Sequence, residues 1–395
     1  MKIATFTTLY PSAARATHGL FVEQRLTHLV ATGKVTSRVI APVPWFFSTR
    51  PRFGDYAKFA ATPRRETRAG ITIDHPRYLL PPKVGMRVAP YALAWGAQPA
   101  FRKLREEGHD FELIDAHYFY PDGVAAAFLA GHFGRPLVIT ARGTDLSYIP
   151  RFKRPRRMIQ WAAQQAAGII CVCQALKDSL IELGVDGAKI TVLRNGVDLA
   201  KFAPGDREAQ RRELGWQTPT LLSVGNLYTH KGHDLAIRGM ALLPDYRLKI
   251  IGSGPERDSF ARLAQAEGVA DRVEFLGAIA QTELKRYYGA ADALVLASSR
   301  EGWANVLLEA MACGTPVVAS AVGGSPEVVT APAAGVLMRE RTPAALAEAV
   351  RALAGSNVTR DATRAYAEHF SWDATSAGQI ALFEKILASR KSLTS

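Results

Sequence analysis

Two glutamates, Glu301 and Glu309, stand in the stretch EGWANVLLEAMACGTPVVASAVGGSPEVV. The pattern predicts a short helix over Asn305–Ala312, which ends before Gly314, a residue whose free φ suits a helix C-terminus. Glu309 lies among apolar residues of this helix, where an unpaired carboxylate would cost free energy. A functional role is therefore favoured for Glu309 over a purely structural one.

A lysine in an earlier loop, Lys231, precedes a predicted helix N-terminus, where a cation and backbone N–H groups can hold a phosphate. The alternative for Lys231 alone is an ordinary solvated loop side chain. Carboxylates close to a phosphate-binding cation would repel a phosphate, so Glu301 and Glu309 are expected to accept hydrogen bonds from hydroxyls. Sugars and ribose supply such hydroxyls. The loop with Gly252 and Gly254 could admit a ligand or form an ordinary tight turn.

The composition indicates a folded protein of two domains with anionic partners. The chain has 395 residues, of which 48% are hydrophobic and 22% charged, enough for a large core. Its formal net charge of +13 suits nucleic acid, nucleotide-like substrates or an anionic membrane surface. The cysteines Cys171, Cys173 and Cys313 have no spacing for a disulfide or a metal site, so we expect small buried residues of a cytoplasmic protein.

Membrane insertion and metal binding are not expected. The beginning of the chain, MKIATFTTLYPSA, lacks the apolar region of a signal peptide. No apolar run is long enough to span a bilayer, so any membrane contact is expected to be peripheral. Neither Asp-x-Asp nor a histidine spacing typical of zinc occurs, and we expect neither a metal nor a cofactor.

Apolar strand-like runs alternate with amphipathic helical runs, which predicts parallel sheets covered on both faces. The α/β pattern occurs in two series, separated by a turn-rich stretch that begins at Asn195. We predict two doubly wound domains facing across a cleft, residues 1–195 and 196–371, and a helix at residues 372–395 that packs back on the first domain. Ligands bind beyond the carboxyl ends of such strands. Residues 44–90, rich in Pro and Arg, predict a long surface excursion.

The predicted elements are given by their residue ranges. Strands are expected at residues 3–9, 38–43, 112–116, 137–140, 168–172 and 190–193, and then at 221–224, 248–251, 273–276, 293–297, 316–319 and 335–338. Helices are expected at residues 20–31, 92–106, 122–132, 155–167 and 174–183, and then at 233–243, 256–267, 281–290, 305–312 and 343–354.

The stretch from Glu301 resembles the E-x7-E signature of retaining, nucleotide-sugar-dependent glycosyltransferases of family 4 (glycosyltransferase group 1), which have the B-type fold of two Rossmann-like domains. The segments VGNLYTHKG, IGSGPE, LRNGVDLAKFAP and FSWDATS are similar to the same family, so the resemblance covers nearly the whole second domain. It implies that Glu301 contacts the donor sugar, that Glu309 binds the ribose hydroxyls and that Lys231 holds the pyrophosphate. It also implies that four residues after Glu301 line the donor site: Gly302, Trp303, Ala304 and Asn305.

One donor-side position departs from the family pattern, because many members have Arg where this chain has Asn226. Asparagine cannot neutralise a pyrophosphate. Part of that positive charge must come from another residue, or the two-cation arrangement of the family is absent. The resemblance keeps Asn226 and Gly254 on the donor side, and Arg300 is a nearby cation whose direction the sequence does not show.

In the first domain the resemblance is looser. It places Gly19 in a glycine-bearing first loop, where the backbone meets the donor or the acceptor, with His18 on the acceptor side. It implies that His117 lies near the reacting sugar, while Asp115 replaces the earlier histidine of the family's pair. Considered alone, His117 at a strand end could equally be a local hydrogen-bonding group. The loop after the next strand is expected to face the acceptor with two residues, Arg142 and Asp145.

The segment RFKRPRR, from Arg151 to Arg157, has five cations in seven residues and no acid. We expect it to dock on anionic lipid, at about 1 kcal/mol per cation near the surface, where a lipid-linked acceptor would be met. The alternatives are a solvated charged face and a nucleic-acid contact. Nucleic acid is not expected as a partner, because no recognised nucleic-acid motif accompanies the charge.

Together these observations predict a cytoplasmic retaining glycosyltransferase, peripheral at the inner face of the cell membrane. It would move a sugar from a nucleotide diphosphate sugar to a glycan or lipid-linked glycan acceptor, in the assembly of cell-surface polysaccharide or glycolipid. Two alternatives stay open. A nucleotide-sugar 2-epimerase of the same fold would need no separate acceptor, and a non-catalytic, membrane-docked module would bind the nucleotide sugar without turnover.

Overall fold

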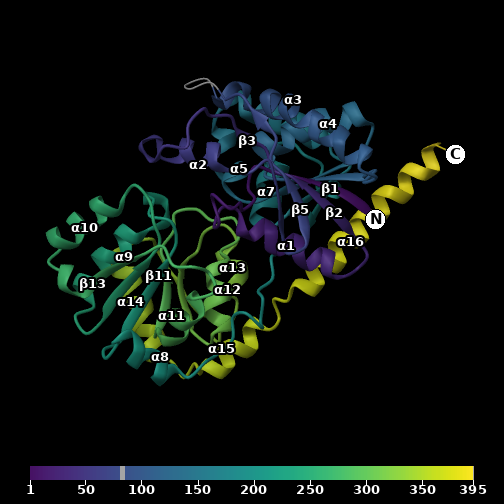
Figure 1. Ribbon diagram of the computed structural model, residues 1–395. Coiled ribbons are helices and arrows are strands. Elements are labelled where there is room, and N and C mark those ends of the chain that lie inside the picture. Colours follow the sequence, from purple (N-terminus) through teal and green to yellow (C-terminus); the bar gives the residue numbers. More distant parts are fainter. Residues whose placement is uncertain (81–84, 395) are drawn as a thin grey trace. The chain divides into compact units, whose positions relative to one another are not determined.

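The computed structural model describes residues 1–80 and 85–394, and their side chains up to residue 390. The chain forms two compact units. Unit 1 consists of Met1–Arg194 and Asp373–Ser395, and unit 2 consists of Asn195–Trp372. Figure 1 shows that each unit, taken by itself, is a sheet with helices packed against it.

The main sheet of unit 1 has eight strands in the order β10-β9-β8-β7-β1-β2-β5-β4, parallel except for the pair β4 and β5. The strand order reverses between β1 and β7, which in open α/β sheets marks the place where a ligand binds. The strands are β1 (Lys2–Phe6), β2 (Thr36–Ile40), β4 (Arg65–Arg68), β5 (Ile71–Asp74), β7 (Leu113–His117), β8 (Leu137–Ala141), β9 (Gly168–Cys171) and β10 (Ile190–Val192). Two short strands pair separately, β3 (Val43–Pro44) and β6 (Arg77–Tyr78).

Helices cover both faces of the sheet in unit 1 (Figure 1). On one face, Leu26 of α1 and Phe383 of α16 share a hydrophobic core with Ile3 and Val39 of the strands. On the other face lie α3 and α4, where Phe101 stacks on Phe133 at 5.5 Å between ring centroids. The helices are α1 (Leu20–Ala31), α2 (Asp55–Ala61), α3 (Gly85–Glu106), α4 (Val124–Phe133), α5 (Thr144–Ser147), α6 (Lys153–Gln165), α7 (Gln174–Glu182) and α16 (Trp372–Thr394).

Unit 2 contains a six-stranded parallel sheet in the order β13-β12-β11-β14-β15-β16. The order reverses between β11 and β14. The strands are β11 (Thr220–Val224), β12 (Arg247–Ile251), β13 (Val273–Gly277), β14 (Ala293–Leu296), β15 (Val317–Ser320) and β16 (Gly335–Met338).

The helices of unit 2 fall into two groups, because right-handed crossovers in opposite directions place helices on opposite faces. Leu235 of α9, Phe260 of α10 and Leu346 of α14 join one core, while α8, α11, α12 and α15 pack together. The helices are α8 (Arg207–Leu214), α9 (His233–Gly239), α10 (Arg257–Ala266), α11 (Leu284–Ala290), α12 (Asn305–Ala312), α13 (Ser325–Val328), α14 (Pro343–Ala354) and α15 (Arg360–Ala367). The predicted α/β class with two doubly wound units is confirmed.

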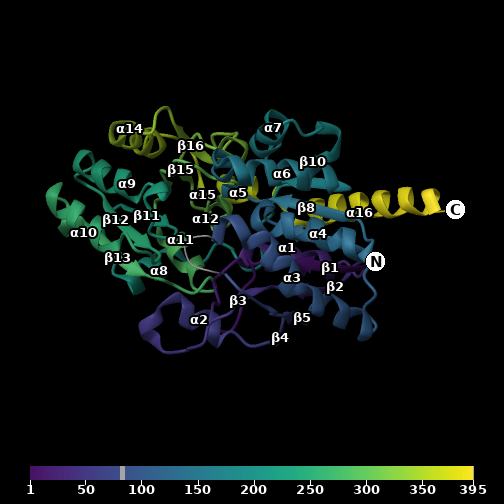
Figure 2. The same cartoon turned by 90° about the horizontal axis from the view of Figure 1, so that it is seen from above.

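The predicted surface excursion over residues 44–90 is wrong for part of that stretch, of which residues 81–84 lie outside the described residues. Ile71 and Ile73 of β5 are buried, and β5 extends the main sheet beside β2. The strand β4 then pairs antiparallel with β5 and forms the edge of the sheet, as Figure 2 shows. The alternating isoleucines of ITID are an ordinary strand signal, which the surrounding prolines and arginines obscured.

Candidate active site

The loops that follow β11 and β14 bring two predicted donor-site residues into contact. Because these strands run parallel, the loops after them lie at the same edge of the sheet, where the strand order reverses. The ammonium of Lys231 lies 2.8 Å from Oε1 of Glu301. Ser298 donates a second hydrogen bond to the same oxygen at 2.7 Å. The carboxylate of Glu301 is therefore fixed by two donors from two loops.

Close backbone packing holds the loop of Glu301 in place. Gly323, with a φ of +54°, lies so close to this loop that a Cβ there would come 1.9 Å from the carbonyl oxygen of Glu301. The N–H of Gly324 donates to the carbonyl of Gly302 at 3.0 Å. Gly254 is constrained in the same way, because its Cβ would lie 2.5 Å from the carbonyl oxygen of Leu227. Loop packing alone thus requires glycine at 254, and its place in a donor site stays a prediction.

Glu309 is buried on α12, with 6% of its surface exposed, and its two oxygens have different partners. The Tyr288 hydroxyl donates to Oε2 at 2.9 Å, and the Gln281 amide donates to Oε1 at 3.0 Å. Burial raises the pKa of Glu309, although both hydrogen bonds act in the opposite direction. Burial also holds the pKa of the Tyr288 hydroxyl well above its usual value. These contacts stabilise the buried carboxyl group, and each oxygen keeps a lone pair for a further donor.

The four residues that follow Glu301, which the resemblance places in the donor site, lead into α12. Gly302 and Ala304 are buried and contribute only backbone polar groups. Asn305 accepts a hydrogen bond from the Asn195 amide at 3.2 Å. The indole N–H of Trp303 is buried and has no hydrogen-bond partner among the residues that the structure describes. An unpaired buried donor costs free energy, so this N–H is available for a ligand oxygen.

The loop after β11 shows where the missing family arginine would lie. Asn226 is exposed and leaves no cation at that position. Arg300, the cation considered as a substitute, lines a cavity of about 410 Å³ together with Tyr228 and His230 of the same loop. Arg300 therefore lies beside the loop that carries Lys231.

In unit 1, His117 lies at the carboxyl end of β7 with a charged residue on each side of its ring. Its Nε2 lies 3.3 Å from a carboxylate oxygen of Asp115, two residues earlier on the same strand. Its Nδ1 lies 2.6 Å from the guanidinium of Arg142, which follows the neighbouring strand β8. Because the guanidinium can only donate, Nδ1 must accept and Nε2 must carry the proton. Both ring nitrogens are thus engaged within unit 1.

The electrostatics of this group keep His117 neutral. Burial, with 1% of the residue exposed, and the nearby Arg142 lower the pKa of His117 to about 4, although Asp115 acts in the opposite direction. Burial likewise lowers the pKa of Arg142 well below its usual value. The lowered pKa of His117 agrees with the neutral ring, protonated on Nε2 only, that its two contacts require.

The other predicted residues of unit 1 make mainly backbone contacts. Asp145 is fully buried and accepts from the N–H groups of Phe119 at 2.9 Å and Gly143 at 2.6 Å. His18 contacts the carbonyl oxygen of Thr8 through Nε2 at 3.1 Å. A Cβ on Gly19 would come 2.3 Å from the carbonyl of Leu9, so loop packing requires this glycine. Acceptor binding by Asp145 and His18, and donor binding by Gly19, stay predictions.

Two buried residues of the same network have no signal in the sequence. Gln379 of α16 donates to a carboxylate oxygen of Asp115 at 3.1 Å and accepts from Nε of Arg25 at 2.8 Å. Both residues are 1% exposed. Gln379 and Arg25 lie far apart in the chain, and neither belongs to a motif. Only the fold brings Gln379 into contact with Asp115, which in turn lies beside His117.

Two family models match the chain. The model described as Glycosyltransferase Family 4 matches residues 37–201, and the model described as Glycosyl transferases group 1 matches residues 206–370. The D-inositol 3-phosphate glycosyltransferase of Mycobacterium marinum is 32% identical over 305 residues, which are 71% of this chain and 65% of that protein. The chain belongs to the group 1 glycosyltransferases of family 4.

Solved structures share the fold of this group 1 glycosyltransferase at low identity. Sucrose-phosphate synthase from Thermosynechococcus elongatus aligns with a TM-score of 0.79 and 21% identity, over 98% of this chain and 100% of that one. Anabaena HepE in complex with UDP-glucose aligns with a TM-score of 0.71 and 20% identity, over 99% of each chain. The predicted architecture of two Rossmann-like domains is confirmed.

Three further expectations for this glycosyltransferase concern membranes, metals and cysteines. Across residues 1–80 and 85–394, none of the helices has the length and apolar character needed to cross a membrane. The same residues contain no group of three or more His, Cys, Asp or Glu side chains placed to hold a metal ion. Cys171, Cys173 and Cys313 are buried and are not joined by a disulfide, as expected for small core residues.

The burial of His117 predicts a stability that falls in acid. Between pH 6.5 and about 4, the unfolded chain takes up a proton that folded His117 does not, so the stability falls as the pH falls. From pH 8 to pH 5 this one residue should cost about 2 kcal/mol, at about 1.4 kcal/mol per pH unit. In His117→Gln, whose amide can replace both ring contacts, that part of the pH dependence should vanish.

Urea unfolding of both proteins at pH 8 and pH 5 measures this difference. The stability gap between the wild type and His117→Gln should narrow by about 2 kcal/mol at the lower pH. His18 and His233 have a pKa lowered to about 4 by burial as well, and they contribute equally in both proteins. A gap that does not change with pH would show that folded His117 takes up a proton normally.

Proposed function

We propose that this chain is a retaining glycosyltransferase that moves a sugar from a nucleotide diphosphate sugar to a glycan or lipid-linked glycan acceptor, in the assembly of cell-surface polysaccharide or glycolipid. The observation that carries the proposal is the ion pair of Lys231 and Glu301, 2.8 Å apart, at the switch point of the second sheet. A cation beside a carboxylate suits a ligand that presents both phosphate and hydroxyl groups. HepE was solved with UDP-glucose, which supports a uridine diphosphate sugar as the first donor to test.

On this proposal residues 196–371 hold the donor. Lys231 contacts the pyrophosphate, Glu301 contacts the donor sugar and Glu309 accepts from a ribose hydroxyl. The unpaired indole N–H of Trp303 supports a ligand oxygen next to Glu301. The remaining donor positions contribute mainly backbone: Gly302, Ala304, Asn305, Asn226 and Gly254.

Residues 1–195 hold the acceptor, with His18, Arg142 and Asp145 on that side, and Gly19 is assigned to donor binding. His117 lies near the reacting sugar on this proposal, as the family resemblance implies, and its contacts with Arg142 and Asp115 fix the orientation and tautomer of the ring. The acceptor hydroxyl attacks the anomeric carbon as the bond to the phosphate breaks, and the leaving phosphate takes the hydroxyl proton on the same face. Because the acceptor oxygen attacks on the face from which the phosphate leaves, the configuration is retained without a side-chain nucleophile. Lys231 and backbone N–H groups, in place of a metal ion, stabilise the leaving charge.

The test is a thermal-shift screen against nucleotide diphosphate sugars, followed by turnover of the selected donor on lipid-linked and free glycan acceptors. We expect one donor to raise the melting temperature and to be consumed only when an acceptor is present. The anomeric configuration of the product, measured by NMR, should match that of the donor, and EDTA should leave the rate unchanged. Formation of an epimer from donor alone would indicate the 2-epimerase, and binding without turnover would indicate the non-catalytic module.

Peripheral contact with an anionic membrane is the second part of the proposal. The five cations from Arg151 to Arg157 are all exposed at the start of α6, and Phe152 between them is 41% exposed. On α3, Trp95 is 76% exposed, an unusual position for tryptophan away from an interface. Exposed aromatic and cationic side chains are typical of membrane-interface contacts.

Vesicle co-sedimentation tests this contact. The chain should bind vesicles that contain about one third phosphatidylglycerol, and Arg154→Glu/Arg157→Glu should bind them more weakly, at about 1 kcal/mol per cation removed. The control Lys34→Glu/Lys285→Glu changes the charge equally at two exposed positions elsewhere. Equal binding of both double variants would remove the Arg151 to Arg157 segment from the proposal.

A further inference from the structure

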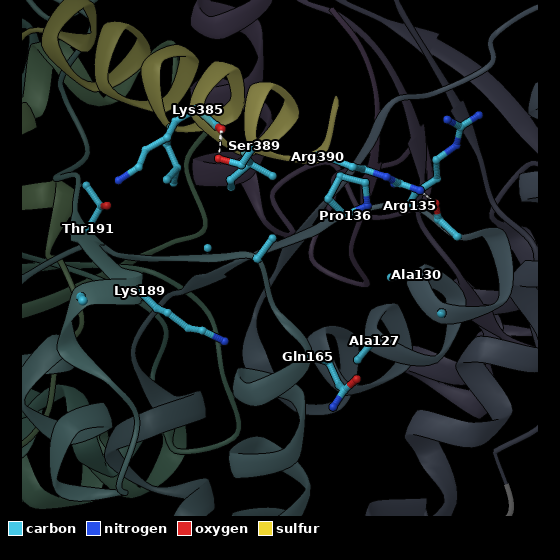
Figure 3. A pocket seen from close by; sticks show the side chains of 17 residues that line it. Ala127, Ala130, Arg135, Pro136, Gln165, Lys189, Thr191, Lys385, Ser389 and Arg390 are labelled. Atoms are coloured by element: carbon cyan, nitrogen blue, oxygen red, sulfur yellow. Dashed lines mark hydrogen bonds between the residues drawn. The ribbon is translucent and has the colours of Figure 1, made fainter. Parts of the chain in front are cut away.

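A cavity of about 600 Å³ lies in unit 1, at the end of the main sheet where the strands β8, β9 and β10 begin. His117 ends β7 and Arg142 follows β8. Because β7, β8, β9 and β10 run parallel, the cavity lies at the amino ends of these strands, whereas His117 and Arg142 lie at their carboxyl ends. Its walls come from α4, the end of α6, the short 3-10 helix Gly187–Lys189 and α16 (Figure 3). The volume is within the range of small-molecule sites, about 300–1,000 Å³.

Positive charge dominates the lining of this cavity. Among the described residues that line it there is no carboxylate, and there are four cations: Arg135, Lys189, Lys385 and Arg390. Lys189 is held by the carbonyl oxygens of Gln164 at 3.1 Å and Ala166 at 3.3 Å. These acceptors are neutral, so they orient the ammonium without cancelling its charge. In Figure 3 this ammonium points toward the middle of the cavity.

Lys385 of α16 adds a second uncompensated charge. Its ammonium makes no hydrogen bond or ion pair with the backbone or side chains of residues 1–80 and 85–390. Arg135 differs, because its guanidinium is paired with Asp110 at 2.7 Å. Two lysines from separate elements, one of them held in place by the protein, therefore supply positive charge for an anionic group from two walls of the cavity.

The rest of the cavity is apolar. Ala127 and Ala130 of α4 are buried, and Leu382 and Ile386 of α16 pack partly on the core of unit 1. The α16 wall is set close to the sheet, since a Cβ on Gly168 would lie 2.9 Å from Cδ1 of Ile386. A ligand that fills this space must combine an anionic group with an apolar chain.

We propose that this cavity binds a single anionic phospholipid, with the phosphate on Lys189 and Lys385 and the first part of an acyl chain against Leu382 and Ile386. This site is separate from the candidate donor and acceptor residues, and it does not depend on the proposed transfer reaction. It also differs from docking on a membrane surface, because it requires one lipid molecule held within a cavity.

The test uses dihexanoyl phosphatidic acid below its critical micelle concentration, titrated into the full chain and followed by calorimetry. Dihexanoyl phosphatidylcholine and inorganic phosphate are titrated in parallel. The charge reversal Lys385→Glu removes one proposed phosphate contact, and Lys34→Glu makes the same change at an exposed position of unit 1 outside the cavity. Thermal melting of each variant confirms that it is folded.

We expect the anionic lipid to bind at least ten-fold more tightly than either phosphatidylcholine or inorganic phosphate. Lys385→Glu should weaken that binding ten-fold or more, the change that corresponds to about 1.4 kcal/mol, while Lys34→Glu should leave it unchanged. Undetectable binding of the lipid, or equal affinity for inorganic phosphate, would overturn the proposal. Equal losses in the two variants would overturn it as well, because they would show a general charge effect.

Discussion

Replacing Lys231 with methionine is expected to lower kcat/KM for the nucleotide-sugar donor by about 100- to 1,000-fold. Lys231 is the cation that unit 2 places beside Glu301, and the leaving pyrophosphate gains negative charge as the sugar departs. Asn226 cannot help to stabilise this negative charge. The fall in kcat/KM should therefore be larger than in a glycosyltransferase whose site has a second cation at that position. Steady-state turnover of the selected donor measures the effect, and Lys231→Arg should keep a measurable part of the rate.

Two controls separate the loss of charge from a loss of structure. Lys285→Met removes an exposed lysine from α11 and should leave kcat/KM unchanged. Because Lys231→Met leaves the Glu301 carboxylate without its cation, the double variant with Glu301→Gln is also needed. If Lys231→Met turned over the donor at the wild-type rate, the pyrophosphate contact would be wrong.

Replacing Glu309 with glutamine is expected to weaken donor binding by about ten-fold or more, because one of the two oxygens that could accept from a ribose hydroxyl becomes an amide donor. The same change should also destabilise unit 2 by about 1–3 kcal/mol, since Tyr288 and Gln281 both donate to this carboxyl group. Calorimetric titration with the donor and urea unfolding measure the two effects separately.

The matched variant is Tyr288→Phe, which removes one hydrogen bond to Glu309 and leaves the carboxyl group in place. It should lower stability by about 1 kcal/mol and leave donor affinity nearly unchanged. Equal losses of affinity in Tyr288→Phe and Glu309→Gln would mean that Glu309 acts only by stabilising the fold. The ribose contact would then be contradicted.

Much of the fold follows from local sequence patterns. The helices at Leu20–Ala31, Asn305–Ala312 and Pro343–Ala354 have the bounds that the apolar period predicts. The helix α8 is not predicted from the sequence. None of its residues is buried, so it lacks the apolar period that identifies a helix packed on a sheet. Its one signal is Asp206, whose side chain accepts from the N–H of Ala209 as an N-cap.

Some contacts of the candidate site could be predicted from the sequence and others could not. Lys231 and Glu301 stand in loops that follow predicted strands, so the sequence predicts that both lie beyond the carboxyl ends of the strands. That they meet depends on the pairing of β11 with β14, which the structure shows. The partners of the buried groups cannot be predicted in this way. Gln379 reaches Asp115 from a helix 264 positions later in the chain, and Tyr288 reaches Glu309 from another helix. Such contacts depend on how helices pack on a sheet, which no spacing of residues records.

The central claim is that unit 2 binds the nucleotide-sugar donor around Lys231 and Glu301. Hydrogen–deuterium exchange of the full chain, with and without the nucleotide that the thermal-shift screen selects, tests it without any substitution. We predict slower exchange at residues 225–232 and 298–309 in the presence of the nucleotide, because bound ligand limits local opening. Protection confined to residues 1–194, with those two segments unchanged at saturation, would contradict the account.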